Sequence, residues 1–337
     1  MKDFSQQMAR LGISVRAGGA VSDGPRASGP VVLGSSGVYL SVVVPMYNEA
    51  SRGLAPRLEE LGTFLCEHYP SHELILVDDG STDDTARVAE SARGRARAFC
   101  LLKLGVNRGK GAAVREGMLA THGRRVAFLD ADLATPLREL PAVLGAVERG
   151  AGVAIGSRGL PESVLLNRES AVRTCCGRLF NRLAQLLLAP GVRDTQCGFK
   201  VLDGALARSL APAMLESRFG FDVEMLYLAA AAGFPAIEIP VCWDHQPCSR
   251  VHFLKDGMSM VSSLIRVWWR ARTGQYRPAV ALIRDAGASG PPAQWTPRQH
   301  GVDEGIGLAP DMGSHGGHCA RRSEGVGMSN DPSRGPG

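Results

Sequence analysis

Residues 124–140 read RRVAFLDADLATPLREL. Four apolar residues at 126–129 run directly into Asp130 and Asp132, which only Ala131 separates. The apolar run predicts a buried strand. Two unpaired carboxylates beside a core repel each other and resist desolvation, so the pattern predicts that a positive group lies between them.

Strand and helix patterns alternate around this stretch. Apolar, β-branched runs predict strands at 40–45, 73–79, 98–104, 125–132 and 152–158, and periodic or capped segments predict helices at 54–69, 81–93, 109–123 and 136–149. Thr135 and Pro136 are expected to be the N-cap and the first residue of the last of these helices. The alternation predicts an α/β fold, Rossmann-like, with an open, mostly parallel sheet and helices on both faces.

Polar residues follow four of the predicted strands. The strand ends read PMYNE at 45–49, DDGS at 78–81, DAD at 130–132 and GSR at 156–158. In open α/β sheets, ligands bind beyond the carboxyl ends of the strands. A single polar loop residue is usually a cap or a solvated charge, but four such groups in one structural position predict a ligand site at this edge.

Asp130 and Asp132 have the chemistry of a metal site. Hard divalent cations prefer oxygen ligands and commonly join carboxylates to substrate phosphates. We therefore expect Mg²⁺ or Mn²⁺ at this pair. The alternative is that the two side chains cap the helix that follows.

The net charge of the chain gives no sign of a nucleic-acid-binding protein. The 337 residues include 38 Lys and Arg against 33 Asp and Glu, and the resulting net charge of +5 does not indicate a nucleic-acid partner. Segments 1–37 and 285–337 are rich in small residues and lack periodicity, so we expect a disordered N-terminal arm and a disordered Gly/Pro-rich tail.

Neither a signal peptide nor a membrane-spanning segment is expected. The first 30 residues lack an apolar h-region, and no stretch approaches the roughly 18 uninterrupted apolar residues of a membrane span. The eight cysteines show no zinc spacing and indicate reduced thiols. We expect a cytoplasmic protein that reaches a membrane only from its surface, as a peripheral protein on the inner face.

Seven sequence blocks occur in order between about residues 39 and 277, and they read VVVPMYNEA, LILVDDGSTDDT, NRGKGAAVREGM, FLDADLAT, IGSR, DTQCGFKVL and FGFDVEMLYLA. The chain thereby resembles the inverting GT-A glycosyltransferases of family 2. Within that family it is most similar to the polyprenyl-phosphate sugar synthases, and best to the dolichyl-phosphate glucosyltransferases. The resemblance implies a GT-A domain over 38–278. It also implies metal-assisted transfer of a sugar to a polyprenyl or dolichyl phosphate, with glucose from UDP-glucose as the expected donor.

The resemblance also implies roles for individual residues. Those implied to bind the donor are Pro45, Tyr47, Glu49, Asp78, Asp79, Gly109, Lys110 and Asp130. Asp79 would accept a hydrogen bond from the uracil ring, and Asp130 with Asp132 would hold the metal and the diphosphate. Arg158 and Arg173 would bind the acceptor phosphate.

The acceptor decides whether a base is needed. A lipid phosphate is already an anion near pH 7, so it needs cations to hold it in line rather than a general base, and arginine matches phosphate oxygens. Direct attack inverts the anomeric configuration. A hydroxyl acceptor, such as a saccharide or a small metabolite, would need a base, and Asp222 or Glu224 would be the candidates.

Two basic amphipathic stretches bear on a lipid partner. The first apolar stripe comprises Val172, Cys175, Cys176, Leu179, Leu183, Leu186 and Leu187, and the second comprises Val261, Leu264, Ile265 and Trp268. Such helices suit a membrane interface, although the alternative is that each stripe packs on the sheet. The sequence departs from mannosyl relatives at Ala134, where they usually carry a Gln, and from the family at Arg250, where a Lys is usual.

Overall fold

The computed structural model describes residues 37–166, 171–189, 191–244 and 253–287. The arm predicted at 1–37 lies outside these residues except for Gly37, and the predicted tail lies outside them from 288 onward. Arg250 is also outside them.

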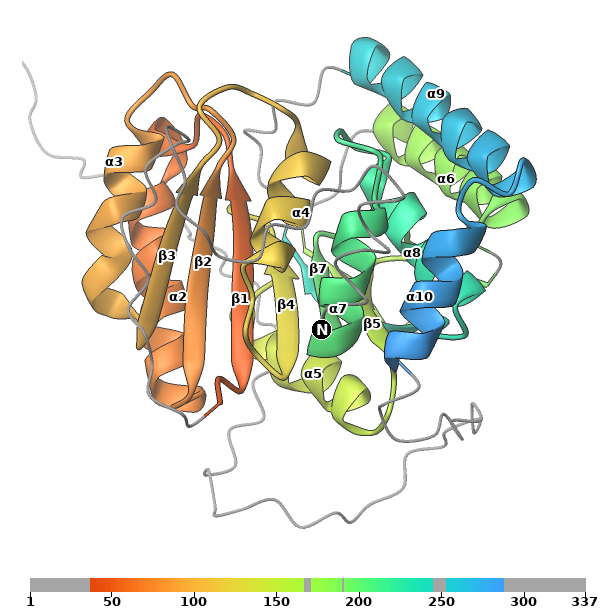
Figure 1. The fold of residues 1–337 in the computed structure, drawn as a ribbon. Helices are drawn as coiled ribbons and strands as arrows, with labels where there is room; N and C mark the ends of the chain where they lie inside the picture. The colour runs from red at the N-terminus through yellow and green to blue at the C-terminus, as the bar shows by residue number, and fades with distance from the viewer. Residues whose placement is uncertain (1–36, 167–170, 190, 245–252, 288–337) are drawn as a thin grey trace, which may run out of the picture. The chain divides into compact units, whose positions relative to one another are not determined.

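Seven strands form one sheet in the order β3-β2-β1-β4-β7-β5-β8 (Figure 1). Their bounds are β1 Leu40–Met46, β2 His72–Asp78, β3 Ala98–Lys103, β4 Arg125–Leu129, β5 Val153–Ser157, β7 Phe199–Asp203 and β8 Ala236–Pro240. All neighbours pair in parallel except β7, which is antiparallel to both β4 and β5. The prediction of an open, mostly parallel sheet is confirmed. A separate ribbon pairs β6 (Val164–Leu165) with β9 (Cys242–Trp243).

Helices cover both faces of the sheet, as predicted (Figure 1). One face packs against α2 (Leu54–His68), α3 (Thr85–Glu90) and α5 (Leu140–Glu148). The other packs against α4 (Lys110–Leu119), α7 (Gly204–Leu210) and α8 (Phe221–Ala231). An outer layer of α6 (Ala171–Leu187), α9 (Phe253–Arg272) and α10 (Arg277–Gly287) joins the same core cluster.

This two-sided cover explains the uninterrupted apolar runs. Along β1, Val42 and Val44 belong to the core cluster with α2 and α5, whereas Val43 belongs to the cluster with α4. Successive side chains of a strand point to opposite faces, so a strand buried on both sides must be apolar at every position.

Two expectations fail at element boundaries. Pro136 has an extended ψ of 147°, so the expected start of a helix there is wrong. A 3₁₀ turn at Leu137–Glu139 comes first, and α5 begins at Leu140. The domain boundary expected at 278 falls inside α10, which continues to Gly287 because Ile283 is buried in the core.

Substitution of Phe128 tests how tightly the core packs beneath the carboxyl ends of the strands. Its ring is buried and packs edge-on against Phe221, with ring centroids 5.8 Å apart. We expect Phe128→Ala to lower the free energy of unfolding by about 3–5 kcal/mol, because it removes buried area and leaves a cavity. Urea denaturation measures this. Val106→Ala, at a side chain that is 66% exposed, should change stability by about 0.5 kcal/mol or less, and equal effects of the two variants would contradict the packing.

Candidate functional site

The DAD segment forms a tight turn at the end of β4. The Leu133 N–H donates to the Asp130 carbonyl at 3.1 Å, and Leu133 has a φ of 46°, in the left-handed region. A branched side chain seldom adopts this conformation, and such strain concentrates at functional sites. The turn keeps Asp130 and Asp132 together at the carboxyl edge of the sheet.

Lys110, the first residue of α4, supplies a positive group beside Asp130, a partner that the sequence analysis did not assign; the metal ion expected at the pair stays a prediction. Its Nζ lies 2.7 Å from Asp130 Oδ1 and 5.4 Å from the centre of the Phe128 ring. Burial alone lowers the pKa of Lys110, but the negative charges of Asp130 and Asp222 outweigh it and raise the pKa. Lys110 is therefore a charged ammonium.

The pair brings two carboxylates close to a single lysine. Burial raises the pKa of Asp132, and the charge of Asp130 raises it further, although the Ala134 N–H donates to Asp132 Oδ1 at 3.1 Å. Within the described residues, no group of three or more His, Cys, Asp or Glu side chains could hold a metal ion. The two carboxylates fit a hard divalent cation only when diphosphate oxygens and water complete its shell.

A close backbone approach fixes Asp130. Its N–H donates to the Gly198 carbonyl at 3.0 Å, and a Cβ on Gly198 would lie 1.9 Å from Asp130 Oδ2. Only glycine fits there. The DTQCGFK segment thus packs its glycine directly against the carboxylate.

Asp79 holds the turn before α4 rather than projecting alone into the site. Its two oxygens accept from the Arg108 N–H at 2.7 Å and the Gly109 N–H at 2.8 Å. Burial raises the pKa of Asp79 against these two bonds, and Asp78 adds to the rise. Gly109 has a φ of 101°, which favours glycine. The predicted donor residues Asp79, Gly109 and Lys110 are therefore one connected unit.

The first strand end is tied to the second by a residue that the sequence analysis did not single out. Asn48 Oδ1 accepts from the Thr82 N–H at 2.8 Å, and Asn48 has a φ of 54°. Its only signal in the sequence was its place inside PMYNE. Glu49, next in the chain, pairs with Arg52 at 2.9 Å, while burial raises its pKa.

The remaining donor candidates lie at the same edge. Pro45 and Asp78 close the β1–β2 pairing, in register with Val77 and Met46 respectively. Asp78 is buried and its Oδ1 accepts from the Ser81 N–H at 3.2 Å. Tyr47, half-buried, follows β1.

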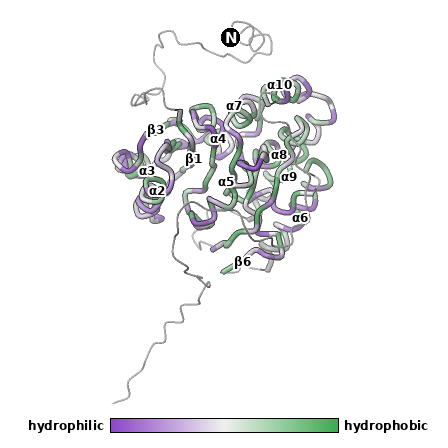
Figure 2. Tube along the Cα trace, turned by 90° about the horizontal axis from the view of Figure 1, so that it is seen from below, coloured by the Kyte–Doolittle hydropathy of each residue, from purple (hydrophilic) through white to green (hydrophobic). Residues whose placement is uncertain are grey.

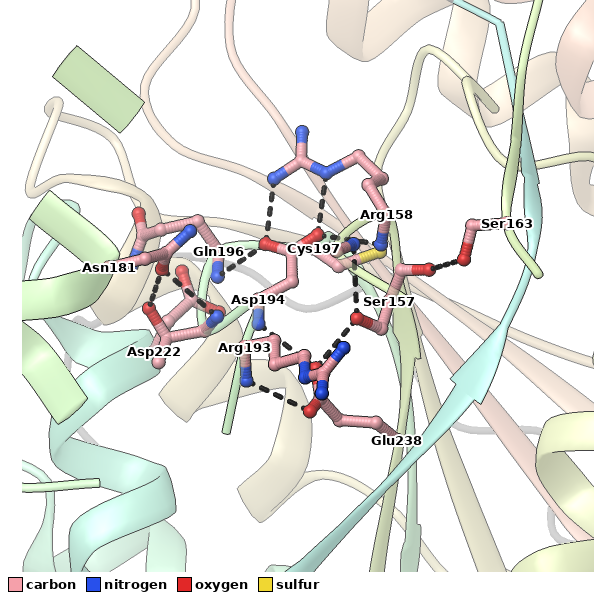
Figure 3. Close-up of polar contacts among 12 residues, drawn as sticks. Ser157, Arg158, Ser163, Asn181, Arg193, Asp194, Gln196, Cys197, Asp222 and Glu238 are labelled. Atoms are coloured by element: carbon pink, nitrogen blue, oxygen red, sulfur yellow. Dashed lines mark hydrogen bonds and ion pairs between the residues drawn. The ribbon is translucent and has the colours of Figure 1, made fainter. Parts of the chain in front are cut away.

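Arg158 already has a carboxylate partner (Figure 3). Its Nε and Nη2 donate to the two oxygens of Asp194 at 2.7 and 2.9 Å, and its guanidinium lies 5.3 Å from the centre of the Trp243 ring. Asp194 is nearly inaccessible, and Glu238 accepts from its N–H at 2.9 Å. Arg158 is thus held in one orientation. Sequence reasoning missed Asp194, although it begins DTQCGFK. Arg173 lies in α6, but the structure does not describe its side chain.

The two candidate bases are buried and engaged. Asp222 Oδ1 lies 2.5 Å from Nζ of Lys200, which is fully buried, and Glu224 accepts from the N–H groups of Leu215 and Glu216 and from the Tyr276 hydroxyl. Burial raises the pKa of both carboxylates. Both side chains therefore already have hydrogen-bond or ion-pair partners.

Comparison with known proteins shows the family to which the chain belongs. Residues 41–208 match the family described as glycosyl transferase family 2. The chain is 35% identical over 252 residues to the dolichyl-phosphate beta-glucosyltransferase of Dictyostelium discoideum, covering 71% of this chain and 77% of that one. It is 36% identical over 263 residues to the Drosophila melanogaster protein of the same name, covering 74% and 80%.

A solved structure shares the fold. It is a glucosyl-3-phosphoglycerate synthase from Mycobacterium tuberculosis in complex with phosphoglyceric acid, with a TM-score of 0.50, 21% identity, and coverage of 69% of this chain and 80% of that one. The chain thus has the GT-A fold, and its similar relatives show that it is a glycosyltransferase. The chain belongs to glycosyl transferase family 2, and its similar relatives are dolichyl-phosphate beta-glucosyltransferases.

The Arg158–Asp194 pair gives a stability prediction with a pH signature. Burial would raise the pKa of Asp194, but the charge and hydrogen bonds of Arg158 outweigh it and lower the pKa below the ordinary 3.8. The ionised carboxylate therefore stabilises the fold above that value, and the stabilisation disappears as pH falls through the lowered pKa.

We expect Asp194→Asn to lower the free energy of unfolding by about 3 kcal/mol at pH 7, because it breaks a buried ion pair. The difference from the wild type should shrink as the pH falls below about 4. Urea unfolding between pH 7 and pH 3 measures both. A difference that stays constant over this range would show that the charge of Asp194 contributes nothing.

Proposed function

We propose that this protein transfers glucose from UDP-glucose to a polyprenyl or dolichyl phosphate with inversion at the anomeric carbon. One observation carries the proposal. The carboxyl edge of the sheet holds both the Asp130–Lys110 ion pair and the Arg158 guanidinium that Asp194 orients. The DTQCGFK segment connects the two, because it contains both Asp194 and Gly198, which contacts Asp130. The names of the similar relatives support the sugar and the acceptor.

On the donor side, the chain binds and orients a nucleoside diphosphate. The strand ends that carry Tyr47, Glu49 and Asp79 would enclose the nucleoside, and Lys110 would face the diphosphate. Asp130 and Asp132 would hold Mg²⁺ or Mn²⁺, which when bound supplies positive charge for the leaving diphosphate. Because Lys110 is anchored by Asp130 before the donor arrives, little reorganisation is needed during transfer.

On the acceptor side, Arg158 would bind a phosphate oxygen. Asp194 holds its guanidinium in place through two hydrogen bonds, and preorganisation of this kind lowers the entropic cost of aligning the reactants. A phosphate monoanion or dianion attacks without losing a proton. This chemistry suits a site in which Asp222 and Glu224 are buried and already bonded. Arg173 would be a second phosphate ligand.

A transfer assay tests the function directly. The protein, Mn²⁺ or Mg²⁺, radiolabelled UDP-glucose and a polyprenyl phosphate are mixed, and label in the organic phase is counted, with GDP-mannose in parallel. We expect lipid product from UDP-glucose. Asp132→Asn and Arg158→Ala should each reduce it by about 10²–10³-fold, the usual loss when one charge-stabilising group is removed.

Glu59→Gln, which removes an exposed carboxylate paired with Arg95, serves as the control and should retain full activity. Release of UDP only when an alcohol or saccharide is added would overturn the lipid-phosphate acceptor while preserving the donor site. Label from GDP-mannose alone would overturn the sugar and the nucleotide.

A membrane surface is the proposed location of the acceptor. The described helices include none that is long and apolar enough to cross a bilayer. On α6, Phe180 and Ala184 face the core, whereas Leu179 and Leu186 of the predicted stripe are 59% and 81% exposed. The alternative that this stripe packs on the sheet is therefore wrong for these residues.

The stripe predicted on α9 divides between two environments. Leu264 is buried and Trp268 packs against the core, whereas Ile265 and Trp269 are 55% and 63% exposed. The neighbouring helices α6 and α9 lie side by side, and both carry apolar and polar residues (Figures 1 and 2). Exposed Arg178 and Arg182 on α6 add positive charge. We propose that α6 and α9 dock on the anionic inner face of a membrane, from the cytoplasm.

Vesicle sedimentation tests this docking. Fully burying one large apolar side chain contributes about 1.5–3 kcal/mol, so the double variant Ile265→Ser, Trp269→Ser should weaken binding to anionic phospholipid vesicles by more than about tenfold. Leu119→Ser, at an exposed leucine of α4, is the matched control and should bind like the wild type. Equal binding of the double variant and the wild type would contradict docking through α9.

A further inference from the structure

Besides its apolar packing through Leu264 and Val267, helix α9 is tied to the core by a buried carboxylate, Glu216. Its side chain is 3% exposed and lies in the loop before α8. Arg266 donates from Nε and Nη2 to both oxygens of Glu216, at 3.1 and 2.7 Å, and Arg270 Nη1 donates to Oε1 at 2.7 Å. Burial would raise the pKa of Glu216, but the hydrogen bonds from Arg266 and Ser263 and the charges of both arginines lower it. Glu216 is thus a charged group that two arginines of α9 satisfy.

The backbone of the same loop touches the donor turn at 109–111. The Ala112 N–H donates to the Ser217 carbonyl at 3.0 Å. A Cβ on Gly109 would lie 2.4 Å from the backbone carbonyl oxygen of Ser217, and a Cβ on Gly111 would lie 2.5 Å from the backbone carbonyl oxygen of Glu216. The two backbones are therefore in direct contact, without space between them. A shift of residues 216–217 must move the turn that carries Lys110.

A second support holds the loop from the core side. Glu224 accepts from the Glu216 N–H at 2.8 Å and from the Tyr276 hydroxyl at 2.5 Å. The loop is thus fixed between Glu224, which belongs to the core, and the arginines of α9, which belong to the outer layer. Its position depends on both.

We propose that Glu216 is a positioning residue that couples the docking of α9 to the geometry of the donor turn 109–111, so that donor affinity depends on the α9 clamp. The identity of the donor rests on the proposed function, but the coupling does not. Coupling between binding sites is reciprocal. A surface that holds α9 in place would therefore tighten donor binding, and a bound donor would tighten binding of α9 to that surface.

Calorimetric titration with UDP and Mn²⁺ tests the coupling. Glu216→Gln keeps the shape of the side chain but removes the charge that holds Arg266 and Arg270. We expect its affinity for UDP to fall about five- to twentyfold, within the usual range of coupling between sites. The affinity of Arg266→Gln for UDP should also fall, but by less than that of Glu216→Gln, because Arg270 still holds Glu216. The double variant Glu216→Gln, Arg266→Gln should lose no more affinity for UDP than Glu216→Gln alone, because both changes break the same interaction.

Hydrogen exchange separates positioning from general stability. Backbone amides of residues 108–117 in the unliganded protein should exchange faster in Glu216→Gln, whereas Glu59→Gln should match the wild type. A lowered melting temperature with unchanged UDP affinity and unchanged exchange at 108–117 would overturn the proposal and leave Glu216 purely structural. If the wild type bound no UDP, the proposed donor would be wrong, and exchange would still decide the coupling. If Glu216→Gln did not fold, Arg266→Gln at a half-exposed side chain would provide both readouts.

Discussion

Every buried acid at the carboxyl edge of this sheet must be compensated, and this constraint organises the site. Desolvating a carboxylate costs several kcal/mol unless a cation or N–H groups take the place of water. Arg158 compensates the buried Asp194, Lys200 compensates the buried Asp222, and Lys110 pairs with the partly exposed Asp130. These pairs come from different elements, so each one ties two parts of the chain together at the place where a charged substrate would bind.

The antiparallel strand β7 makes this arrangement possible. It enters the sheet between β4 and β5, and its leading segment, DTQCGFK, therefore crosses the edge at which the parallel strands end. Gly198 meets Asp130 there, Asp194 meets Arg158, and Lys200 at the strand itself reaches Asp222. One short segment thus connects the proposed donor half and the proposed acceptor half of the site. The same packing buries Asp222 against Lys200.

The outer layer is built differently from the sheet. Helices α6 and α9 bury one side each and leave leucines, an isoleucine and a tryptophan exposed, while two arginines of α9 reach inward to Glu216. The proposed lipid surface and the donor turn are consequently separated by only one loop, 214–218. Under the proposed function, acceptor recruitment and donor geometry would both depend on this loop.

The sequence by itself determined the sheet, the helices that alternate with it and the edge at which Asp130 and Asp132 lie, because apolar runs and their polar ends are local patterns. It also predicted a positive group at that pair, for which the carboxylate chemistry indicated a divalent metal. Only the tertiary structure showed that Lys110 pairs with Asp130, since Lys110 lies 20 residues earlier in the chain. The partners of Arg158, Asp222, Glu224 and Glu216, and the side of α6 that faces outward, were also decided by contacts between distant segments. Such contacts depend on how the helices pack, and periodicity along the chain carries no information about them.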